Sequence, residues 1–533
     1  MLSIDELLNK KITSREKLMA AKRTLAKKYG EKILSNSEIL KEYRKRTAGR
    51  SARLERILRK RAVRTLSGIA PVAVLTKPYP CPGRCAYCPT EKNVPQSYLS
   101  NEPAVMRAIR CGYDPYKQVR LRLRALEANG HEPTKIELIV IGGTWSVLPE
   151  VYKFWYIKEC FRGANEFGKI ISKSQLPIKS QIPNLKKQLL KEQKKNESAK
   201  YKLIGITLET RPDYINEKEL LEMRELGATR VELGVQAVDD RILKLNKRGA
   251  GVAEIARATE LLKNFGFKVT YHIMPGLYGA TAKKDLANFK KLFSDERFQP
   301  DQLKFYPTVV TRGSLLYRWW KAGRYKPYSD KVLQNLIVAC KKAVPPYVRI
   351  IRLIRDIPGE SIMAGNLVTN LRQVMKDRGV KCKCIRCREA KEKLEVKSKK
   401  LKVIKYKASS RMEYFLSYES RDGKVLYGFC RLRLGKIAII RELHVYGELV
   451  PVGGGKKVQH AGLGKLLMAE AEKIARRNGY EKIAVIAGVG VRGYYRKLGY
   501  RLEKSYMVKR IMSLRGAAFS PGFDPGDEAI SCS

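Results

Sequence analysis

Three cysteines, Cys81, Cys85 and Cys88, lie close together on a segment that directly follows the apolar run Ala70 to Thr76. The prolines and the glycine among them prevent a regular helix or strand at this point. Three clustered thiolates suit an iron–sulfur cluster or a tetrahedral metal ion, and each of these normally takes a fourth ligand. No fourth Cys or His lies nearby in the sequence. A four-iron cluster bound here would keep one iron open to a substrate or cofactor; a structural zinc loop is the alternative.

The composition is that of a large chain with packed cores. At 533 residues the chain is long enough for more than one domain, and 44% of its residues are hydrophobic. No apolar run approaches the roughly 20 residues that cross a bilayer, and the N-terminus lacks the apolar centre of a signal peptide. Six of the 11 cysteines form two tight groups, which favours metal sites over disulfides in a reducing compartment. We therefore expect a cytoplasmic protein with no membrane-spanning segment.

The chain is strongly basic. Its 108 Lys and Arg residues against 52 Asp and Glu residues give a formal net charge of +56. A thermophilic or lysine-rich proteome is one explanation, but charge enrichment in thermophiles is usually balanced in sign. An excess of this size favours a polyanionic partner, most simply RNA or DNA. Residues 1–64 are basic and compatible with helices, so we expect a helical nucleic-acid-binding segment there; a solvated helical arm without a ligand is the alternative.

Residues 65–375 alternate short β-like runs with helical stretches, which predicts a parallel sheet of the β/α type. The predicted strands are Ala70–Thr76, Ile136–Ile141, Leu203–Leu208, Arg230–Val235, Lys268–Ile273 and Gln302–Tyr306. Six such strands favour an α/β fold with a partial parallel (β/α) barrel, in which the site lies at the carboxyl ends of the strands. Residues 163–200 interrupt the alternation with Lys, Gln, Ser and Asn, and predict an insertion or a mobile loop.

Polar and glycine-rich residues follow the predicted strands, where such a site would be built. They are the three cysteines after the first strand, Gly142, Gly143 and Thr144 after the second, residues 209–213 after the third, Gln236 after the fourth, residues 274–276 after the fifth, and Lys304 and Tyr306 around the sixth. His272, near the end of the fifth strand, is a core residue, a site residue or a zinc ligand, and of these we favour the core.

A basic linker over residues 376–405 carries a second group of thiols, Cys382, Cys384 and Cys387. The spacing Cys-x-Cys-x2-Cys is compatible with structural zinc that takes a fourth ligand from elsewhere. The basic surroundings lower thiol pKa values and so favour thiolates. Structural zinc is our interpretation; reduced surface thiols are the alternative, and a second iron–sulfur cluster is a weaker one.

The pattern of residues 406–512 predicts a second α/β unit with a phosphate-binding turn. Residues 513–533 are rich in Gly, Pro and Ser, which predicts a disordered tail. A predicted strand precedes the turn and another follows its helix. Successive amides at a glycine-rich helix N-terminus cradle a pyrophosphate, and the glycines let the backbone approach the ligand. The residues that form this turn are Gln459, Gly462, Leu463, Gly464 and Lys465.

The first cysteine group resembles that of the radical S-adenosylmethionine (SAM) enzymes, which use Cys-x3-Cys-x2-Cys after the first strand of a partial barrel. The resemblance implies a [4Fe-4S] cluster on Cys81, Cys85 and Cys88, with SAM chelating its open iron. It also implies that Gly142, Gly143 and Thr144 receive the SAM amino group, although the family usually has an acidic residue where Thr144 stands.

The second α/β unit resembles the GNAT acetyltransferases, which bind acetyl-CoA at the glycine-rich turn. The resemblance implies that Tyr495 lies near the thioester sulfur. The strand residues that would receive the pantetheine arm are Glu442, Leu443, His444 and Val445.

Over residues 60–510 the chain resembles the catalytic subunits of Elongator, in their archaeal form. The segments that carry the resemblance are CPGRCAYCPTEKNVPQSYLSNEPAVMRA, RCGYDPYKQ, IGGTW, ITLETRPDYI, RVELGVQAVDDRIL, YHIMPGL, RELHVYGELVPV, QHAGLGKLLMAEAE and GVGVRGYYRKLGY. Eukaryotic members have a longer spacing between the residues matching Cys81 and Cys85. The resemblance implies transfer RNA as the polyanionic partner.

The implied reaction is the synthesis of carboxymethyluridine at wobble uridine 34. A reduced cluster would cleave SAM to a 5′-deoxyadenosyl radical, which would take hydrogen from the acetyl-CoA methyl group; the carbon radical would add to C5 of uracil, and thioester hydrolysis would follow. Lys135 matches the family's acetyl-CoA-contacting lysine, and Lys304 and Tyr306 are candidates for positioning uracil or radical. An electron donor is implied as a partner, and a homodimer stays open.

Two other functions fit parts of the sequence. The first is a protein lysine acetyltransferase whose cluster is only structural, with Glu442 as base and Tyr495 as acid. Its activity would survive Cys85→Ser and would need no SAM. The second is a non-catalytic tRNA-binding scaffold, which would bind with steep salt dependence and cleave neither SAM nor acetyl-CoA.

Overall fold

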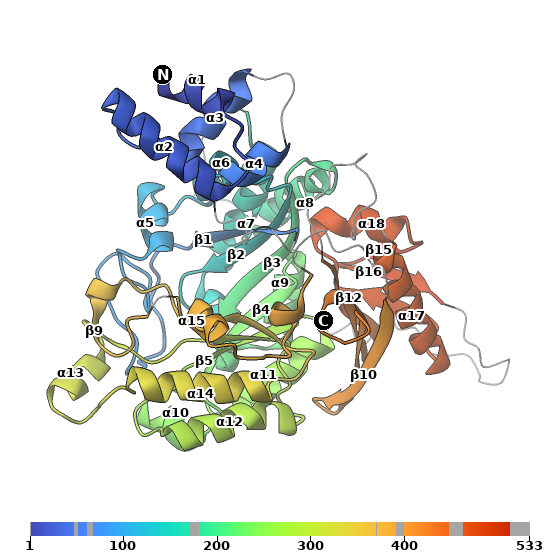
Figure 1. Ribbon diagram of the computed structural model, residues 1–533. Coiled ribbons are helices and arrows are strands. Elements are labelled where there is room, and N and C mark those ends of the chain that lie inside the picture. The colour runs from blue at the N-terminus through green and yellow to red at the C-terminus, as the bar shows by residue number, and fades with distance from the viewer. Residues whose placement is uncertain are drawn as a thin grey trace.

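The computed structural model describes residues 2–46, 52–60, 65, 68–169, 181–368, 370–390, 399–446 and 462–511. The predictions for Gln459 and for a disordered tail over 513–533 concern residues outside this set. The described chain forms a helical N-terminal part, a parallel sheet covered by helices, and a second, mostly antiparallel sheet (Figure 1). Within these residues, no helix combines the length and the apolar character needed to cross a membrane.

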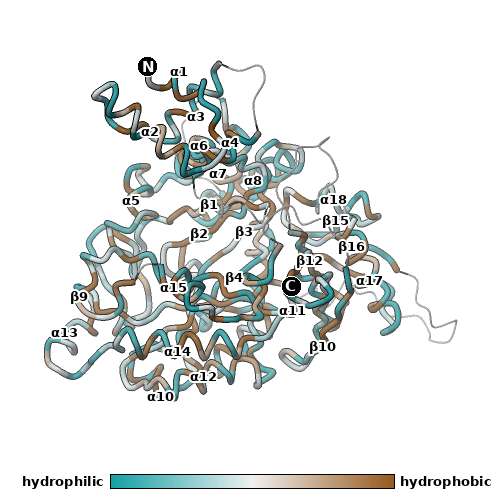
Figure 2. Tube along the Cα trace, viewed as in Figure 1, coloured by the Kyte–Doolittle hydropathy of each residue, from teal (hydrophilic) through white to brown (hydrophobic). Residues whose placement is uncertain are grey.

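The N-terminal part is helical, as the sequence predicts. Its helices pack around a small core of leucine and isoleucine, which includes Leu18, Leu25 and Ile39. Figure 2 shows brown hydrophobic residues alternating with teal hydrophilic ones along these helices, so each helix buries one stripe and exposes the rest. The elements are α1 Leu2–Asn9, α2 Arg15–Tyr29, α3 Asn36–Arg46 and α4 Ala52–Leu58.

The large sheet is parallel, with the strand order β1-β2-β3-β4-β5-β6-β8. Its strands are β1 Ala70–Leu75, β2 Lys135–Ile141, β3 Lys202–Thr210, β4 Arg230–Gln236, β5 Lys268–Ile273, β6 Gln302–Phe305 and β8 Arg349–Arg352. The first six coincide with the predicted strands. Strand β8 was not predicted, because its sequence, RIIR, is only four residues long and half charged.

Helices cover the outer face of this sheet. Along β2, Ile136, Leu138 and Val140 face the helices and are almost fully buried, whereas Lys135 and Glu137 point to the concave face. This alternation explains why the concave face is polar. The helices within residues 103–343 are α5 Pro103–Arg110, α6 Pro115–Ala128, α7 Glu150–Asn165, α8 Ile182–Ser198, α9 Glu217–Glu225, α10 Asp240–Leu245, α11 Val252–Asn264, α12 Ala282–Ser294, α13 Leu315–Lys321 and α14 Asp330–Ala343.

The prediction of an insertion loop over 163–200 is wrong for most of the described residues in that range. Residues 182–198 form helix α8, which packs beside α7. Leu185 and Leu189 lie one helical turn apart and are fully buried. The side-chain amide of Asn196 donates to the Tyr201 carbonyl and closes the C-terminal end of α8. Burial of these leucines stabilises the helix, even though a composition rich in Lys and Gln is typical of a loop.

The second sheet has the order β10-β11-β12-β13-β14-β16-β15. Strands β13 and β14 run parallel and pair only over residues 438–440 of β13, after which they separate. Its elements are β10 Lys400–Ala408, β11 Arg411–Glu419, β12 Leu426–Leu434, β13 Ala438–Val445, α17 Leu463–Arg477, β14 Lys482–Val485, α18 Arg492–Arg496, β15 Arg501–Glu503 and β16 Tyr506–Arg510. The smaller elements are β7 Val310–Thr311, β9 Ile362–Ala364, α15 Leu371–Asp377, α16 Ile385–Arg388 and the 3-10 helices η2 Trp145–Val147, η3 Pro212–Tyr214, η4 Gly359–Ser361 and η6 Val489–Val491.

The second sheet packs against the amino ends of the parallel strands. A Cβ atom on Gly488 would lie 2.0 Å from the Ile204 carbonyl oxygen, so only glycine fits at this contact. The Arg349 guanidinium at the start of β8 donates to the Tyr446 hydroxyl at 2.8 Å. The two sheets therefore meet at the end of the half-barrel opposite the predicted cysteine site.

A buried cluster of charges joins the two sheets. Arg441 on β13 contacts Asp301, which precedes β6, and its Nη1 lies 2.8 Å from Oε2 of Glu413 on β11. Lys263 on α11 and Arg431 on β12 complete the cluster. All five side chains are at most 1% exposed. Because each charge has partners on the other sheet, the relative orientation of the two sheets is fixed.

Candidate functional site

The first cysteine group lies on the loop that leaves the carboxyl end of β1. The sulfur atoms of Cys81, Cys85 and Cys88 do not all lie within 4.8 Å of one another. Thiolates that share one tetrahedral zinc ion lie about 3.8 Å apart, because the Zn–S bond is about 2.3 Å. Thiolates of an iron–sulfur cluster bind different irons and lie farther apart. The wider spacing fits a cluster better than a single zinc ion.

Two arginines surround the buried Cys85 thiol. Nη1 of Arg248 lies 3.7 Å from the Cys85 sulfur, and Nη1 of Arg211 lies 4.0 Å from it. A hydrogen bond with Cys88, together with the Arg248 and Arg211 charges, lowers the pKa of Cys85 to about 5. The same hydrogen bond and burial raise the pKa of Cys88, so Cys85 is the thiol of this pair that is held as the metal-binding thiolate. Arg211 belongs to the predicted strand-end residues, whereas Arg248 was missed because it follows a helix.

The predicted glycine motif lies beside this loop. Gly142 and Gly143 have φ angles of +134° and +97°, which favour glycine. A Cβ atom on Gly142 would also lie 2.1 Å from Oγ1 of Thr76. Oγ1 of Thr144 lies 3.6 Å from the Cys81 sulfur. The structure thus brings together the two motifs that the sequence placed after neighbouring strands.

A buried polar cluster lies on the concave face near the same end. Glu232 of β4 is fully buried, accepts a hydrogen bond from Nε2 of His272 at 2.9 Å, and contacts Nζ of Lys304. Burial alone would lower the pKa of Lys304, but the Glu232 carboxylate raises it. The Tyr306 and His272 rings meet edge to face with their centroids 5.0 Å apart. Lys304 and Tyr306 therefore belong to one cluster, as their strand position suggested.

The sequence indicates this cluster only in part. His272, for which the core was favoured, is buried, but its Nδ1 also lies 3.5 Å from a Glu209 carboxylate oxygen. Glu232 was missed altogether. A charged residue in the middle of the strand RVELGVQ, on the same face as Arg230, is the feature that would have indicated it.

In the second sheet, β13 carries the predicted residues Glu442 to Val445 at the point where it leaves β14. Oε2 of Glu442 accepts a hydrogen bond from Nε of Arg431 at 3.0 Å, and Oε1 lies 3.9 Å from Nζ of Lys268. Burial raises the pKa of Glu442, but the Lys268 and Arg431 charges outweigh it and lower the pKa. Glu442 is therefore a paired, weakly basic carboxylate.

His444 lies two residues further along β13, between aromatic rings. Its ring centroid lies 4.2 Å from that of Tyr446 and 6.0 Å from that of Phe429. Burial and the Arg349 charge lower the pKa of His444 to about 4. The imidazole is neutral at pH 7 and can offer one donor and one acceptor to a ligand.

We expect His444 to make the protein less stable in acid. The folded state binds this proton more weakly than the unfolded chain does, so the contribution is complete above pH 6.5 and is lost as the pH falls towards 4. The loss is about 3 kcal/mol at pH 4. In His444→Phe, chemical denaturation should show a drop in unfolding free energy between pH 7 and pH 4 that is smaller by this amount. Equal drops in both proteins would contradict the expectation.

Helix α17 begins with the glycine-rich turn. Gly462 caps it with a φ of +72°, and a Cβ atom on Gly464 would lie 2.6 Å from the Tyr494 hydroxyl oxygen. Leu463 is buried and Lys465 is exposed. The Tyr495 ring lies 5.3 Å from that of Tyr494, and burial raises the pKa of Tyr495. Gly462 is exposed, with no atom within 4 Å of an added Cβ atom, so the start of α17 offers its backbone to a ligand such as a pyrophosphate.

Lys135 is the first residue of β2, at the amino end of the sheet. Burial lowers its pKa. The seven residues of β2 place Lys135 about 20 Å from Ile141, the residue before Gly142, since a parallel strand rises about 3.3 Å per residue. Lys135 therefore lies at the edge against which the second sheet packs, and far from the cysteine loop.

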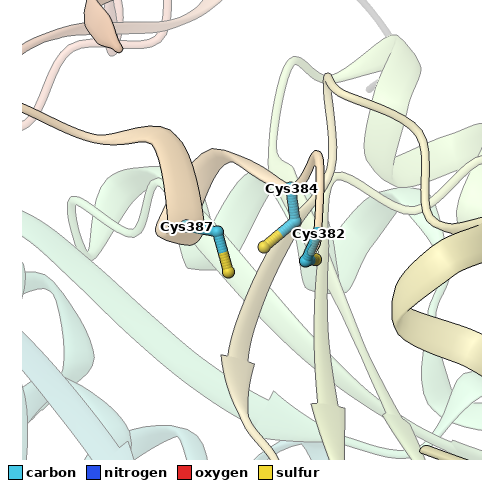
Figure 3. A group of neighbouring side chains, drawn as sticks. All are labelled: Cys382, Cys384 and Cys387. Atoms are coloured by element: carbon cyan, nitrogen blue, oxygen red, sulfur yellow. The ribbon is translucent and has the colours of Figure 1, made fainter. Parts of the chain in front are cut away.

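The second cysteine group gathers its thiols tightly. The sulfur atoms of Cys382, Cys384 and Cys387 lie within 4.8 Å of one another and point into one space (Figure 3). Hydrogen bonds with the two neighbouring thiols lower the pKa of Cys384. Nζ of Lys341 lies 3.8 Å from the Cys387 sulfur. Among the described residues no His, Cys, Asp or Glu supplies a fourth ligand atom. This arrangement fits one tetrahedral metal ion.

Known families match both halves of this arrangement. The sequence matches the Radical SAM superfamily over residues 79–290, the Radical SAM C-terminal domain over 300–379 and the acetyltransferase (GNAT) family over 386–500. A tRNA uridine(34) acetyltransferase of Dehalococcoides mccartyi (strain CBDB1) is 44% identical over 475 residues, which cover 85% of this chain and 100% of that protein. Elongator complex protein 3 of Homo sapiens is 40% identical over 488 residues, which cover 85% of this chain and 86% of that protein.

A solved structure agrees with these matches. The archaeal Methanocaldococcus infernus Elp3 with an N-terminal deletion (1–46) has a TM-score of 0.70 at 39% identity, and the match covers 84% of this chain and 100% of that one. The predicted fold class, a parallel half-barrel of the radical SAM type followed by a GNAT domain, is confirmed.

Proposed function

The chain belongs to the family of tRNA uridine(34) acetyltransferases and Elongator complex protein 3, and we propose that it builds a carboxymethyl group on C5 of the wobble uridine of tRNA from acetyl-CoA. One observation carries the proposal: the half-barrel has a three-cysteine loop at one end and a GNAT domain at the other, and buried ion pairs join the GNAT domain to the half-barrel. A protein that only transfers acetyl groups would not need the three-cysteine loop.

At the carboxyl end of the half-barrel, Cys81, Cys85 and Cys88 are the ligands we assign to a [4Fe-4S] cluster. When bound, such a cluster with SAM supplies one-electron chemistry that removes a hydrogen atom from an unactivated carbon, and an external electron donor must feed it. The backbone at Gly143 is open, since an added Cβ atom would meet only the Gln96 carbonyl oxygen, at 3.9 Å, and this suits the amino group of SAM. Glu232 and His272 at this end are at most 4% exposed, and such enclosure protects the chemistry from side reactions.

The polar cluster near this end suits a flipped uracil. Lys304 keeps N–H donors for the base carbonyls, because its ammonium group has three, and Tyr306 offers a ring face for stacking. Glu232 orients Lys304 and His272, because it contacts each of them. We assign these side chains to positioning the base, while the basic surface of the chain attracts the tRNA backbone.

At the other end, we assign acetyl-CoA to the GNAT domain. The amide groups of Gly462 to Lys465 at the start of α17 suit its pyrophosphate. The gap between β13 and β14, with Leu443 and Val445 on one side, suits the pantetheine arm. Tyr495, His444 and Lys135 then lie around the thioester, from α18, β13 and β2 respectively.

We assign zinc to Cys382, Cys384 and Cys387 and expect one zinc ion per chain. Cys384→Ser should lose the zinc and keep the iron, because the two thiol groups belong to separate loops. Zinc and iron counting after anaerobic reconstitution measures both. Cys430→Ser, at a buried thiol in β12, is the matched control and should keep both metals. Zinc at full occupancy in Cys384→Ser would remove the assignment.

The function is tested by mass spectrometry of tRNA. Wild-type protein with a reconstituted cluster, SAM, acetyl-CoA and a reductant should convert uridine 34 of a suitable tRNA to carboxymethyluridine. Omitting SAM or acetyl-CoA should leave uridine unchanged. Unmodified uridine 34 in the complete reaction, from protein with full iron content, would overturn the proposal.

A further inference from the structure

The two ends of the proposed reaction are far apart. The cysteine loop and Gly142 lie at the carboxyl end of the parallel strands, whereas Lys135 and the GNAT strand β13 lie at the amino end. The length of β2 separates them by about 20 Å. Hydrogen abstraction acts only between atoms in contact, at about 3–3.5 Å. One of the two reacting groups must therefore cross the half-barrel.

The concave face of the half-barrel stays partly accessible to water along its β1–β2 side, whereas Thr207, Glu232 and Thr270 on the same face of β3 to β5 are fully buried. At the amino end, 17% of the Lys268 side-chain surface and 19% of that of Arg349 remain exposed. In the middle, Glu137 keeps 19%, and at the carboxyl end Glu209 keeps 21%. Ile139, between these two levels on β2, is half-buried. The neighbouring outward-facing Ile136, Leu138 and Val140 are exposed by at most 2%.

Paired charges and apolar side chains share this face. Lys268 pairs with Glu442 of the GNAT domain, and Glu137 pairs with Arg230 at 3.0 Å. Arg230 in turn lies 3.8 Å from Glu232, so one file of ion pairs leads from β13 to the polar cluster. Ile139 belongs to the same face, beside Ala73 of β1. This face therefore offers both hydrogen-bonding groups and apolar side chains. Such a surface can bind a flexible ligand that is built of amide and methylene groups.

We propose that the β1–β2 side of the concave face is the passage along which the acyl-pantetheine arm of acetyl-CoA reaches the SAM end of the half-barrel. The inference rests on the proposed function. It assigns the crossing to this arm because the arm enters at β13, where the file of ion pairs begins, while the SAM end is held by the cysteine loop. Ile139 lies halfway, about 13 Å from Lys135, and lines the passage.

A bulky side chain at the midpoint should close the passage. In Ile139→Trp, carboxymethyluridine formation should fall at least about tenfold. SAM cleavage without tRNA and the affinity for acetyl-CoA should stay within about twofold of wild type, because the residues that bind SAM and acetyl-CoA are unchanged. Leu190→Trp, at a position on α8 that is 61% exposed, is the matched tryptophan control. Iron content and thermal unfolding confirm that both variants fold. Wild-type yields from a folded Ile139→Trp protein would overturn the passage, whereas absence of product from wild type would instead defeat the proposed function.

A second measurement needs neither cluster nor tRNA. The cysteine introduced by Ile139→Cys should be alkylated by bromoacetyl-CoA, whose bromide is displaced by the thiolate as a thioether forms. Leu138→Cys, at the adjacent residue that faces the helices, should stay unmodified. Peptide mass spectrometry separates these positions from the natural cysteines. Alkylation at Ile139→Cys that excess acetyl-CoA suppresses supports the passage; no alkylation there, with acetyl-CoA binding intact, would overturn it.

Discussion

Cys85→Ser is expected to abolish SAM cleavage and tRNA carboxymethylation together. Cys85 is the most enclosed thiol of its group, with Arg248 and Arg211 at its sulfur, and a serine hydroxyl is a poor ligand for iron. Because the cluster, SAM and acetyl-CoA act as a unit, both rates should fall by about 10³-fold or more. Deoxyadenosine release and mass spectrometry of uridine 34 measure them.

The matched control is Cys111→Ser, at a buried thiol at the end of α5. It should keep iron content and both activities. Acetyl transfer that survives Cys85→Ser and needs no SAM would instead indicate a protein lysine acetyltransferase. The structure disfavours that alternative, because Glu442, its candidate base, is paired with Arg431 and has a lowered pKa.

Arg441→Met is expected to lower the free energy of unfolding of the GNAT domain by about 3–5 kcal/mol, because it leaves Asp301 and Glu413 as buried carboxylates with too few partners. Arg441 is 1% exposed and contacts both carboxylates. Urea unfolding curves and hydrogen exchange of the amides of β11 to β13 measure the change. Loss of the buried charge cluster should also reduce tRNA modification more than SAM cleavage. Only tRNA modification requires that the GNAT domain and the half-barrel keep their relative orientation.

The control for this substitution is Lys424→Met. Lys424 pairs with Asp422 on the surface, its side chain is 83% exposed, and its removal should cost at most about 1 kcal/mol. A second check is the double variant Arg441→Met with Glu413→Gln, which removes one orphaned charge and should recover part of the loss. An Arg441→Met protein as stable as wild type would mean that the cluster does not hold the two sheets together.

Much of the fold was readable from the sequence because its elements have strong local patterns. The six predicted strands match β1 to β6, since apolar residues at every second position mark the face that packs on helices. The family resemblance and both domain types were likewise confirmed. The exceptions were β8, too short and too charged to read as a strand, and α8, whose Lys- and Gln-rich sequence hid a buried stripe at Leu185 and Leu189.

The candidate site was only partly readable. Cys81 to Cys88 and the glycine motif were identified because ligand type and spacing are local properties. Glu232 and Arg248 were missed, because each acts through a partner distant in sequence: Glu232 binds Lys304, and Arg248 lies against Cys85. A charge inside a strand or after a helix gives no local indication of the group that it will meet.

The sequence by itself determined the chemistry that the chain can hold: two cysteine groups, a glycine-rich phosphate turn and an excess of positive charge, all of which follow from residue type and short-range spacing. Only the tertiary structure decided where these groups lie. The carboxyl ends of parallel strands gather the cysteine loop, Gly142 and Lys304 at one end, and the buried cluster around Arg441 fixes the GNAT domain at the other. Packing between segments more than a hundred residues apart sets that separation, and no local pattern encodes it.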